Sequence, residues 1–239
     1  MEISLKPEIL TSFLGIPISN SLVLSLFTAF ILVGLGVFAV QSLKVIPGKL
    51  QNAAELIIEG ILDFVAGALG NREQAVKFFP LVATIFLFIL FNNWLGVLPG
   101  TGSLTLRGIP LFRSANSDLN TTFALALISV IAIQWYGIRT LGFSKHISKF
   151  FNFTHGPIEF FVGILEFIAE FAKILSFAFR LFGNVFAGEV LLIIIMTLVP
   201  ILAPFPFILL EFFVGFIQAL VFAMLTLIFL KIATETVEH

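Results

Sequence analysis

One long apolar segment indicates the fold class of this chain. It runs from Pro157 to Pro200 and reads PIEFFVGILEFIAEFAKILSFAFRLFGNVFAGEVLLIIIMTLVP. It has no internal proline, so it can form one uninterrupted helix. At about 1.5 Å per residue such a helix would be roughly 60 Å long, about twice the hydrocarbon core of a bilayer. We therefore expect a span that tilts steeply, curves, or runs partly along the membrane surface.

Charged residues recur through this segment at helical spacing. Four of them, each seven positions after the last, share one face, because seven residues turn a helix by nearly two full turns. They are Glu159, Glu166, Lys173 and Arg180. Asn184 extends the stripe, and Glu170 lies three residues before Lys173, a spacing that allows the two to pair. Glu189 follows Arg180 by nine residues and therefore faces the opposite side.

Charges on two faces and at two depths suggest two separate aqueous routes, because charged side chains at membrane depth normally face protein or water. Structural alternatives remain open at this point. Arg180 can form a salt bridge, and Lys173 can snorkel to the membrane surface. Glu159 and Glu166 can lie at the cytoplasmic interface. Arg180 is the hardest to explain structurally, because it lies deep in an apolar run and arginine stays charged in proteins.

The next apolar run, Pro204 to Leu230, carries Glu211 and Gln218 seven residues apart on one face. The short proline-bounded turn before it predicts an antiparallel hairpin of two long helices. Such a hairpin brings Glu211 into the same outer half as Glu189 and places Gln218 level with Arg180. An ordinary interhelical hydrogen bond is the alternative role for Gln218.

The composition of the 239 residues excludes a soluble protein. Hydrophobic residues make up 59% and charged residues 11%, against roughly 45–50% and 25% in soluble domains. A net charge of -1 argues against nucleic-acid binding. There is no cysteine, and the three histidines are scattered, so we expect no metal site and no cofactor. The sequence shows no pairing of a nucleophile with a base of the kind that active sites use, so we do not expect the chain itself to be an enzyme.

Five apolar stretches are long enough to cross a membrane, which predicts an all-α membrane protein of a single domain. The expected division is an outer N-terminal tail 1–20, span 1 at 21–43, a surface helix at 50–70, span 2 at 78–99, span 3 at 120–140, long span 4 at 157–199 and span 5 at 203–232.

The segment between the first two spans differs from them in pattern. Its apolar residues fall at helical spacing, and Glu55, Glu59 and Asp63 form a ladder on another face. This pattern predicts an amphipathic helix on the membrane surface rather than a span. A solvated acidic face on a helix that packs against other protein explains it equally well.

Basic residues orient the spans. If the N-terminus lies outside and the C-terminus lies in the cytoplasm, most of the Lys and Arg residues between the spans lie on the cytoplasmic side. The positive-inside rule favours this orientation. The inside set is Lys44, Lys49, Arg72, Lys77, Arg139, Lys145, Lys149 and Lys231, and the outside set is Lys6, Arg107 and Arg113. The chain is thus expected to be a multi-pass integral membrane protein, and a bacterial plasma membrane is the default location.

Four motifs resemble one protein family, subunit a of F-type ATP synthase. They are SFAFRLFGNVFAGE at Ser176–Glu189, IQALVFAMLTLIFL at Ile217–Leu230, FPLVATIFLFILFNNWLGVLPG at Phe79–Gly100 and SDLNTTFALAL at Ser117–Leu127. The RLFGN core is highly specific for this family. The resemblance covers nearly the whole chain beyond the N-terminal tail.

The resemblance implies five transmembrane helices plus one amphipathic surface helix, with the last two spans forming a long tilted hairpin. It implies a proton-conducting stator subunit, non-catalytic itself, that works in the lipid bilayer against a ring of c subunits. Two offset half-channels would deliver protons to and from the ring carboxylates, coupling proton flow to rotation and to ATP synthesis or hydrolysis. The peripheral-stalk b subunits, and indirectly the catalytic head, are the other implied partners.

The resemblance also implies roles for individual residues. The essential arginine of the family corresponds to Arg180, which would separate the half-channels. Glu189, Asn184 and Gln218 correspond to the family's outer-channel positions. The upstream acid corresponds to Glu166 and the basic residue seven before the arginine to Lys173, with Glu159 and Glu170 as secondary candidates.

Two positions leave questions open. Some members of the family carry histidine where this chain has Glu211. An acid there keeps a proton-accepting group in the outer channel but changes the partner of Glu189. Asp118 either lines the mouth of that channel or caps span 3 as Asx residues do.

The competing function is a proton-coupled secondary transporter, which would show internal repeats and broken helices. The coupled ion, H⁺ by default or Na⁺, is set by the ring.

Overall fold

The structure is a computed structural model, and it describes residues 7–13, 15–41, 44, 48–98, 100, 104–106, 108–143, 157–200 and 202–235. Its long helices are α1 (Asn20–Gln41), α2 (Lys49–Leu69), α3 (Arg72–Val97), α4 (Leu119–Leu141), α6 (Pro157–Leu198) and α7 (Pro204–Thr234). A short 3-10 turn, η2 (Ala115–Ser117), precedes α4.

Five of these helices are long and apolar enough to cross a membrane, and α2 is not among them. The prediction of an all-α membrane protein with five spans and one further helix is therefore confirmed. Two short antiparallel ladders add to it. The first pairs β1 (Ile9–Phe13) with β2 (Ile16–Ser19) in the stretch expected as a tail, and the second pairs β3 (Thr105–Leu106) with β4 (Ile109–Pro110).

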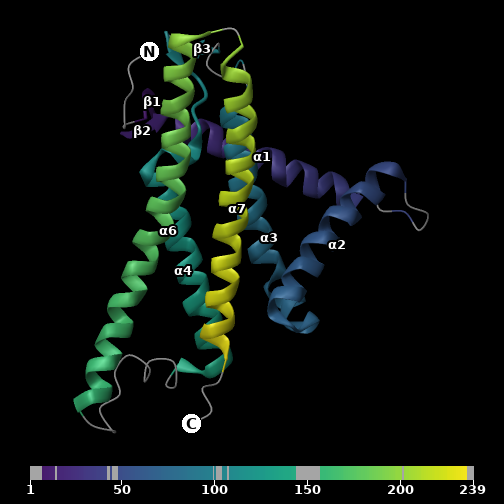
Figure 1. Cartoon of the computed structure of the whole chain (residues 1–239). Helices are drawn as coiled ribbons and strands as arrows, with labels where there is room; N and C mark the ends of the chain where they lie inside the picture. The colour runs from purple at the N-terminus through teal and green to yellow at the C-terminus, as the bar shows by residue number, and fades with distance from the viewer. Residues whose placement is uncertain are drawn as a thin grey trace.

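The core lies where α3, α4, α6 and α7 run side by side (Figure 1). Its fully buried side chains include Phe78 and Ile89 of α3, Ile133 of α4, Leu181 of α6 and Leu227 of α7. Small residues at the contacts, such as Ala126, Ala178 and Ala219, let the helices approach closely.

The long helix α6 is continuous over 42 residues. Its middle turns pack into the core through Phe177, Ala178, Leu181 and Val185, and it carries many exposed apolar side chains on its outer face. Helices α6 and α7 meet where one ends and the other begins, and they diverge toward the opposite end of α6 (Figure 1). The expected unbroken helix and hairpin are therefore present.

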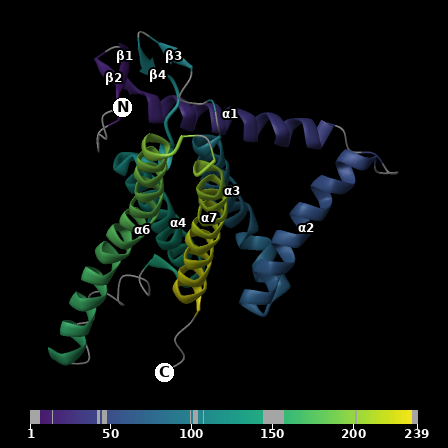
Figure 2. The same cartoon turned by 45° about the horizontal axis from the view of Figure 1, so that its top comes forward.

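Helix α1 runs across the direction of α6 and α7, and α2 returns from its far end toward the bundle (Figures 1 and 2). A 22-residue helix spans a bilayer core of about 30 Å with little tilt, whereas 42 residues do so only when steeply inclined.

The turn between α2 and α3 is built from local signals. Gly70 ends α2 in the left-handed conformation with φ of 70°. The Asn71 side chain then accepts hydrogen bonds from the backbone N–H groups of Glu73 and Gln74 and starts α3. For this reason α3 begins at Arg72, several residues before the apolar run that we expected as span 2.

Helix α2 covers only part of the bundle. Val65 and Leu69 are buried against α3, but Leu56, Ile57 and Ile58 are exposed. An apolar groove of about 590 Å³ lies between α2, α3 and α7, with Phe64 and Trp94 among its lining residues. The exposed apolar side chains of α2 suit a helix that lies against lipid.

Candidate functional site

The α6–α7 hairpin brings two carboxylates together. Glu211 of α7 is 8% exposed, and its carboxylate lies directly against Gly188 of α6, so closely that a Cβ at that position would overlap it. The next residue along α6 is Glu189, which interacts electrostatically with Glu211. The sequence placed these acids in the same outer half, and the structure brings them into one cluster.

A cation from outside the hairpin completes this cluster. Arg113 lies in the segment between β4 and η2, and its Nε is 3.2 Å from Oε1 of Glu189. The two side chains are only 13% and 27% exposed. The site thus holds one guanidinium and two carboxylates in largely buried surroundings, which strengthens their electrostatic interactions.

Amides link the same region to the core helices. The Asn116 Nδ2 donates to Asn93 Oδ1 at 2.8 Å, and the Asn93 Nδ2 donates to the Gly215 carbonyl at 2.9 Å. Nearby, the Trp94 Nε1 donates to the Phe212 carbonyl at 3.1 Å. These bonds tie η2, α3 and α7 together one turn from Glu211.

Asp118 caps α4 and also reaches another helix. Its carboxylate accepts from the Asn120 backbone N–H at 2.9 Å and from the Ser21 hydroxyl of α1 at 2.8 Å. It is buried. The capping alternative for Asp118 therefore describes its local geometry, while the bond to Ser21 adds a contact that the cap does not require.

Several buried polar atoms near these groups form no hydrogen bond within the described part of the chain. They are Asn92 Nδ2, Asn116 Oδ1, Ser114 Oγ and Glu189 Oε2. Buried polar atoms are nearly always satisfied in proteins, so these four atoms are available to hydrogen-bond with water.

Arg180 lies on the other face of α6 and is exposed. Its Nη2 donates to Ser176 Oγ at 3.4 Å, and the Asn184 side chain donates to the Arg180 carbonyl at 2.9 Å. Within the described residues, Arg180 has no carboxylate within salt-bridge distance. The structural salt bridge that was an alternative for Arg180 is absent there.

The inner part of the stripe is not uniform. Lys173 pairs with Glu170 at 2.5 Å and lies 4.6 Å from the centroid of the Phe229 ring of α7, so both charges face inward and are partly buried. The expected pairing of these two residues is confirmed. Glu166 is exposed. Glu159 belongs to α6, but its side chain lies outside the described residues.

Gln218 is half-buried on α7. No hydrogen bond between its side chain and Arg180 or Glu211 occurs in the structure as described. Among the described residues there is also no group of three or more histidine and acidic side chains able to hold a metal ion.

Comparison with known proteins identifies the family. The profile of the ATP synthase A chain family matches residues 22–231. This chain belongs to that family. It is 33% identical over 213 residues to ATP synthase subunit a of Campylobacter jejuni strain 81-176, an alignment that covers 88% of each chain.

Other ATP synthase relatives are similar over the same region. Identity to subunit a of Desulfotalea psychrophila is 39% over 202 residues, covering 83% of this chain and 77% of the relative. Identity to subunit a of Syntrophobacter fumaroxidans is 38% over 209 residues, covering 86% and 80%. The resemblance of the RLFGN motif to the ATP synthase family is thereby confirmed, and the chain is a multi-pass integral membrane protein.

Sequence reasoning about this ATP synthase A chain missed three parts of the site. Arg113 entered only as a charge that helps to set the topology. Asn93 and Asn116 were not singled out as site residues. Two consecutive asparagines, Asn92 and Asn93, inside an apolar span are nevertheless unusual enough to notice. Gly188 gave no sequence signal, because its role comes from the approach of Glu211 on another helix.

Proposed function

We propose that the chain is the proton-conducting stator subunit of an F-type ATP synthase. The observation that carries this proposal is the position of Arg180. Its guanidinium lies on an exposed, largely apolar face of α6, without a carboxylate partner among the described residues. A permanent charge on such a face calls for a partner on another chain. The carboxylates of a c-subunit ring are that partner.

The two faces of α6 support two offset half-channels. Protons from outside pass the buried cluster of Glu189 and Glu211 and reach the ring near Asn184 and Gln218. Protons leaving the ring follow the inner part of the stripe, past Glu166 and Glu159, to the cytoplasm. The polar atoms without partners near Asn116 support the outer route. Asp118 lies at its mouth.

Arg180 separates the two routes. Its positive charge favours the ionised form of a ring carboxylate that approaches it, so the proton leaves on the inner side. The same charge repels a proton that would pass directly from one route to the other. Each elementary charge that crosses the membrane releases about 2.3 kcal/mol per 100 mV, which can drive rotation.

The proposal places the chain in a complex with the c ring, the peripheral-stalk b subunits and, through them, the catalytic head. The N-terminus faces the outside and the C-terminus the cytoplasm of a bacterial plasma membrane. The transporter alternative calls for helices broken at mid-depth. The continuity of α6 through Arg180 argues against it.

The decisive test is ATP-driven proton pumping in inverted vesicles that contain the whole complex. We expect Arg180→Ala to abolish pumping while assembly stays normal, because the barrier between the routes and the ring-facing charge are both lost. Arg180→Lys should also abolish coupled pumping, since lysine can lose its proton in a low-dielectric site and lacks the planar fork.

Arg139→Ala is the matched control. Arg139 is also an exposed arginine on a membrane helix, but it lies in the last turn of α4. We expect wild-type pumping from it. Pumping at the wild-type rate by an assembled Arg180→Ala complex would refute the proposed function.

A further inference from the structure

Arg113 is a buried cation in a segment whose sequence suggests only a loop. Only 13% of its side chain is exposed, and its Nε lies 3.2 Å from Glu189 Oε1. Withdrawing a guanidinium from water costs several kcal/mol unless a carboxylate lies close to it. A loop that needed only solubility would leave the arginine in water, so its burial against α6 needs an explanation.

The segment that carries Arg113 is fixed to α3 by two contacts directly after this residue. A Cβ at Gly96 of α3 would lie 2.6 Å from Ser114 Cβ and 2.8 Å from Ser114 Cα, so only glycine lets this backbone approach. Asn116 also donates to Asn93 of α3. Arg113 is therefore held at Glu189 by the packing of its neighbours as well as by its own ion pair.

Among the residues that the structure describes, the charges of this cluster do not balance. Glu189 and Glu211 contribute two carboxylates, and Arg113 contributes one permanent positive charge. Asp118, at the start of α4, is engaged with Ser21 and Asn120 instead. Two neighbouring carboxylates in buried surroundings do not both stay ionised without compensation. One cation compensates one of them, which leaves a place for one transferable proton on the pair.

We propose that Arg113 is a positioning residue that holds the Glu189 carboxylate at the outer proton route and leaves the Glu189–Glu211 pair with a single transferable proton. The inference rests on the proposed function and deepens it. Arg113 acts through Glu189 and takes up no proton itself. Without this cation, Glu189 loses its fixed orientation toward the Glu211 side of the hairpin, and proton delivery to the ring slows.

The test compares Arg113→Gln with Arg113→Lys in inverted vesicles that contain the whole complex. Pumping is measured per assembled complex. We expect Arg113→Gln to assemble and to lower pumping by up to about 100-fold, the cost of displacing a reacting group by about 1 Å. Arg113→Lys should recover most of the rate, because it keeps the positive charge next to Glu189.

Arg72→Gln is the matched control. Arg72 also pairs with a carboxylate, Asp63, at 2.8 Å, but both side chains are mostly exposed and lie on the α2–α3 turn. We expect its loss to leave pumping unchanged. Arg180→Ala in the same vesicles separates the two proposals. If the Arg180→Ala complex pumps at the wild-type rate, the proposed function fails. If the Arg180→Ala complex does not pump and the Arg113→Gln complex pumps at the wild-type rate, only the inference about Arg113 fails.

The remaining outcomes are also decisive. Wild-type pumping by Arg113→Gln overturns the proposal, and so does an equal loss in the glutamine and lysine variants, because only packing would then matter. If the glutamine variant does not assemble, the lysine variant decides: a rate near wild type supports the proposal, and a deep loss overturns it. Failure of both variants to assemble would make Arg113 structural.

Discussion

At the scale of single residues, Gly188 shows how the residue at one position of a helix is constrained by a side chain on a neighbouring helix. Alanine is normally the better helix former by about 1 kcal/mol. Here glycine is required, because the Glu211 carboxylate occupies the space of a Cβ. The missing methyl group on α6 makes it possible for α7 to bring its acid next to Glu189.

Gly188→Ala should therefore impair proton transfer although it favours the helix. The added methyl group displaces the Glu211 carboxylate, and a shift of about 1 Å in a reacting group costs up to about 100-fold in rate. The measurement is pumping per assembled complex. Gly36→Ala on α1 is the control, since nothing lies within 4 Å of a Cβ there. Equal rates for the two variants would contradict the role given to Gly188.

At the scale of elements, α3 packs against α1, α2 and α7 and reaches α4 through one aromatic side chain. Its Phe78 is 1% exposed and meets Tyr136 of α4 edge-on, with ring centroids 5.4 Å apart. Its Phe86 makes a similar contact with Phe216 of α7. In a membrane, helices associate mainly through packing of this kind, because lipid is as apolar as the side chains.

Phe78→Ala should destabilise the α3–α4 contact by about 3–5 kcal/mol, the usual cost of an aromatic-sized cavity. A thermal unfolding midpoint of the purified complex would measure the loss. The matched control is Phe38→Ala on α1, where the ring is 59% exposed. A similar shift in both variants would mean that Phe78 contributes no packing of its own.

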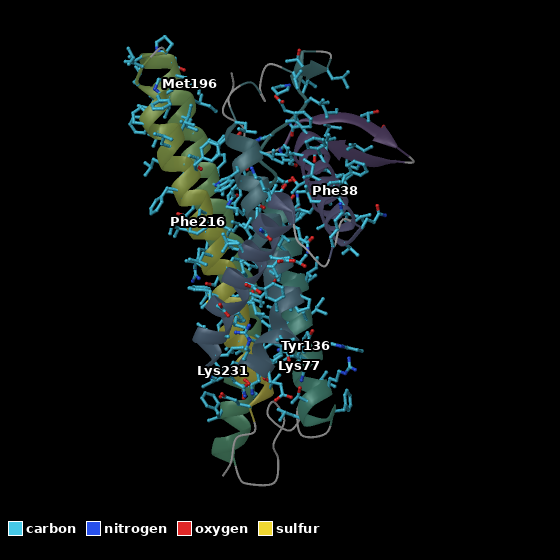
Figure 3. The ribbon with its side chains drawn as sticks, turned by 90° about the vertical axis from the view of Figure 1, so that its right-hand side faces the viewer. Phe38, Lys77, Tyr136, Met196, Phe216 and Lys231 are labelled. Carbon is cyan, nitrogen blue, oxygen red and sulfur yellow. The ribbon has the colours of Figure 1, made fainter. Side chains whose placement is uncertain are left out.

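At the scale of the whole molecule, two basic side chains lie far from the Arg113–Glu189 pair. Lys77 and Lys231 lie toward one end, and Met196 lies at the other (Figure 3). The Arg113–Glu189 pair is close to the Met196 end along α6, so the buried acidic cluster and the basic end are far apart. The proposed orientation puts the Met196 end toward the outside and the Lys77–Lys231 end toward the cytoplasm.

The absence of cysteine makes the orientation directly testable. A single cysteine at Thr11, exposed on β1, should react with a membrane-impermeant maleimide only from the outside. A cysteine at Glu73, exposed at the start of α3, should react only in inverted vesicles. The cysteine-free parent chain is the control for background labelling. Labelling with the opposite sidedness would reverse the orientation and with it both half-channels.

The features that the sequence determined by itself are local. The lengths of the apolar runs predicted five spans, and the missing proline predicted the continuous α6. The nine-residue separation of Arg180 and Glu189 placed them on opposite faces of α6, because helical geometry alone sets that relation. The RLFGN motif then indicated the family. None of these inferences depends on how one helix packs against another.

The composition of the outer cluster was decided by tertiary structure. Arg113 meets Glu189, Glu211 rests on Gly188, and Asn93 bonds to a carbonyl 122 residues away. Each contact depends on the rotation and crossing of packed helices and on the path of a loop, and periodicity along one helix contains neither quantity. The sequence supplied the charged groups, and packing determined which of them became partners.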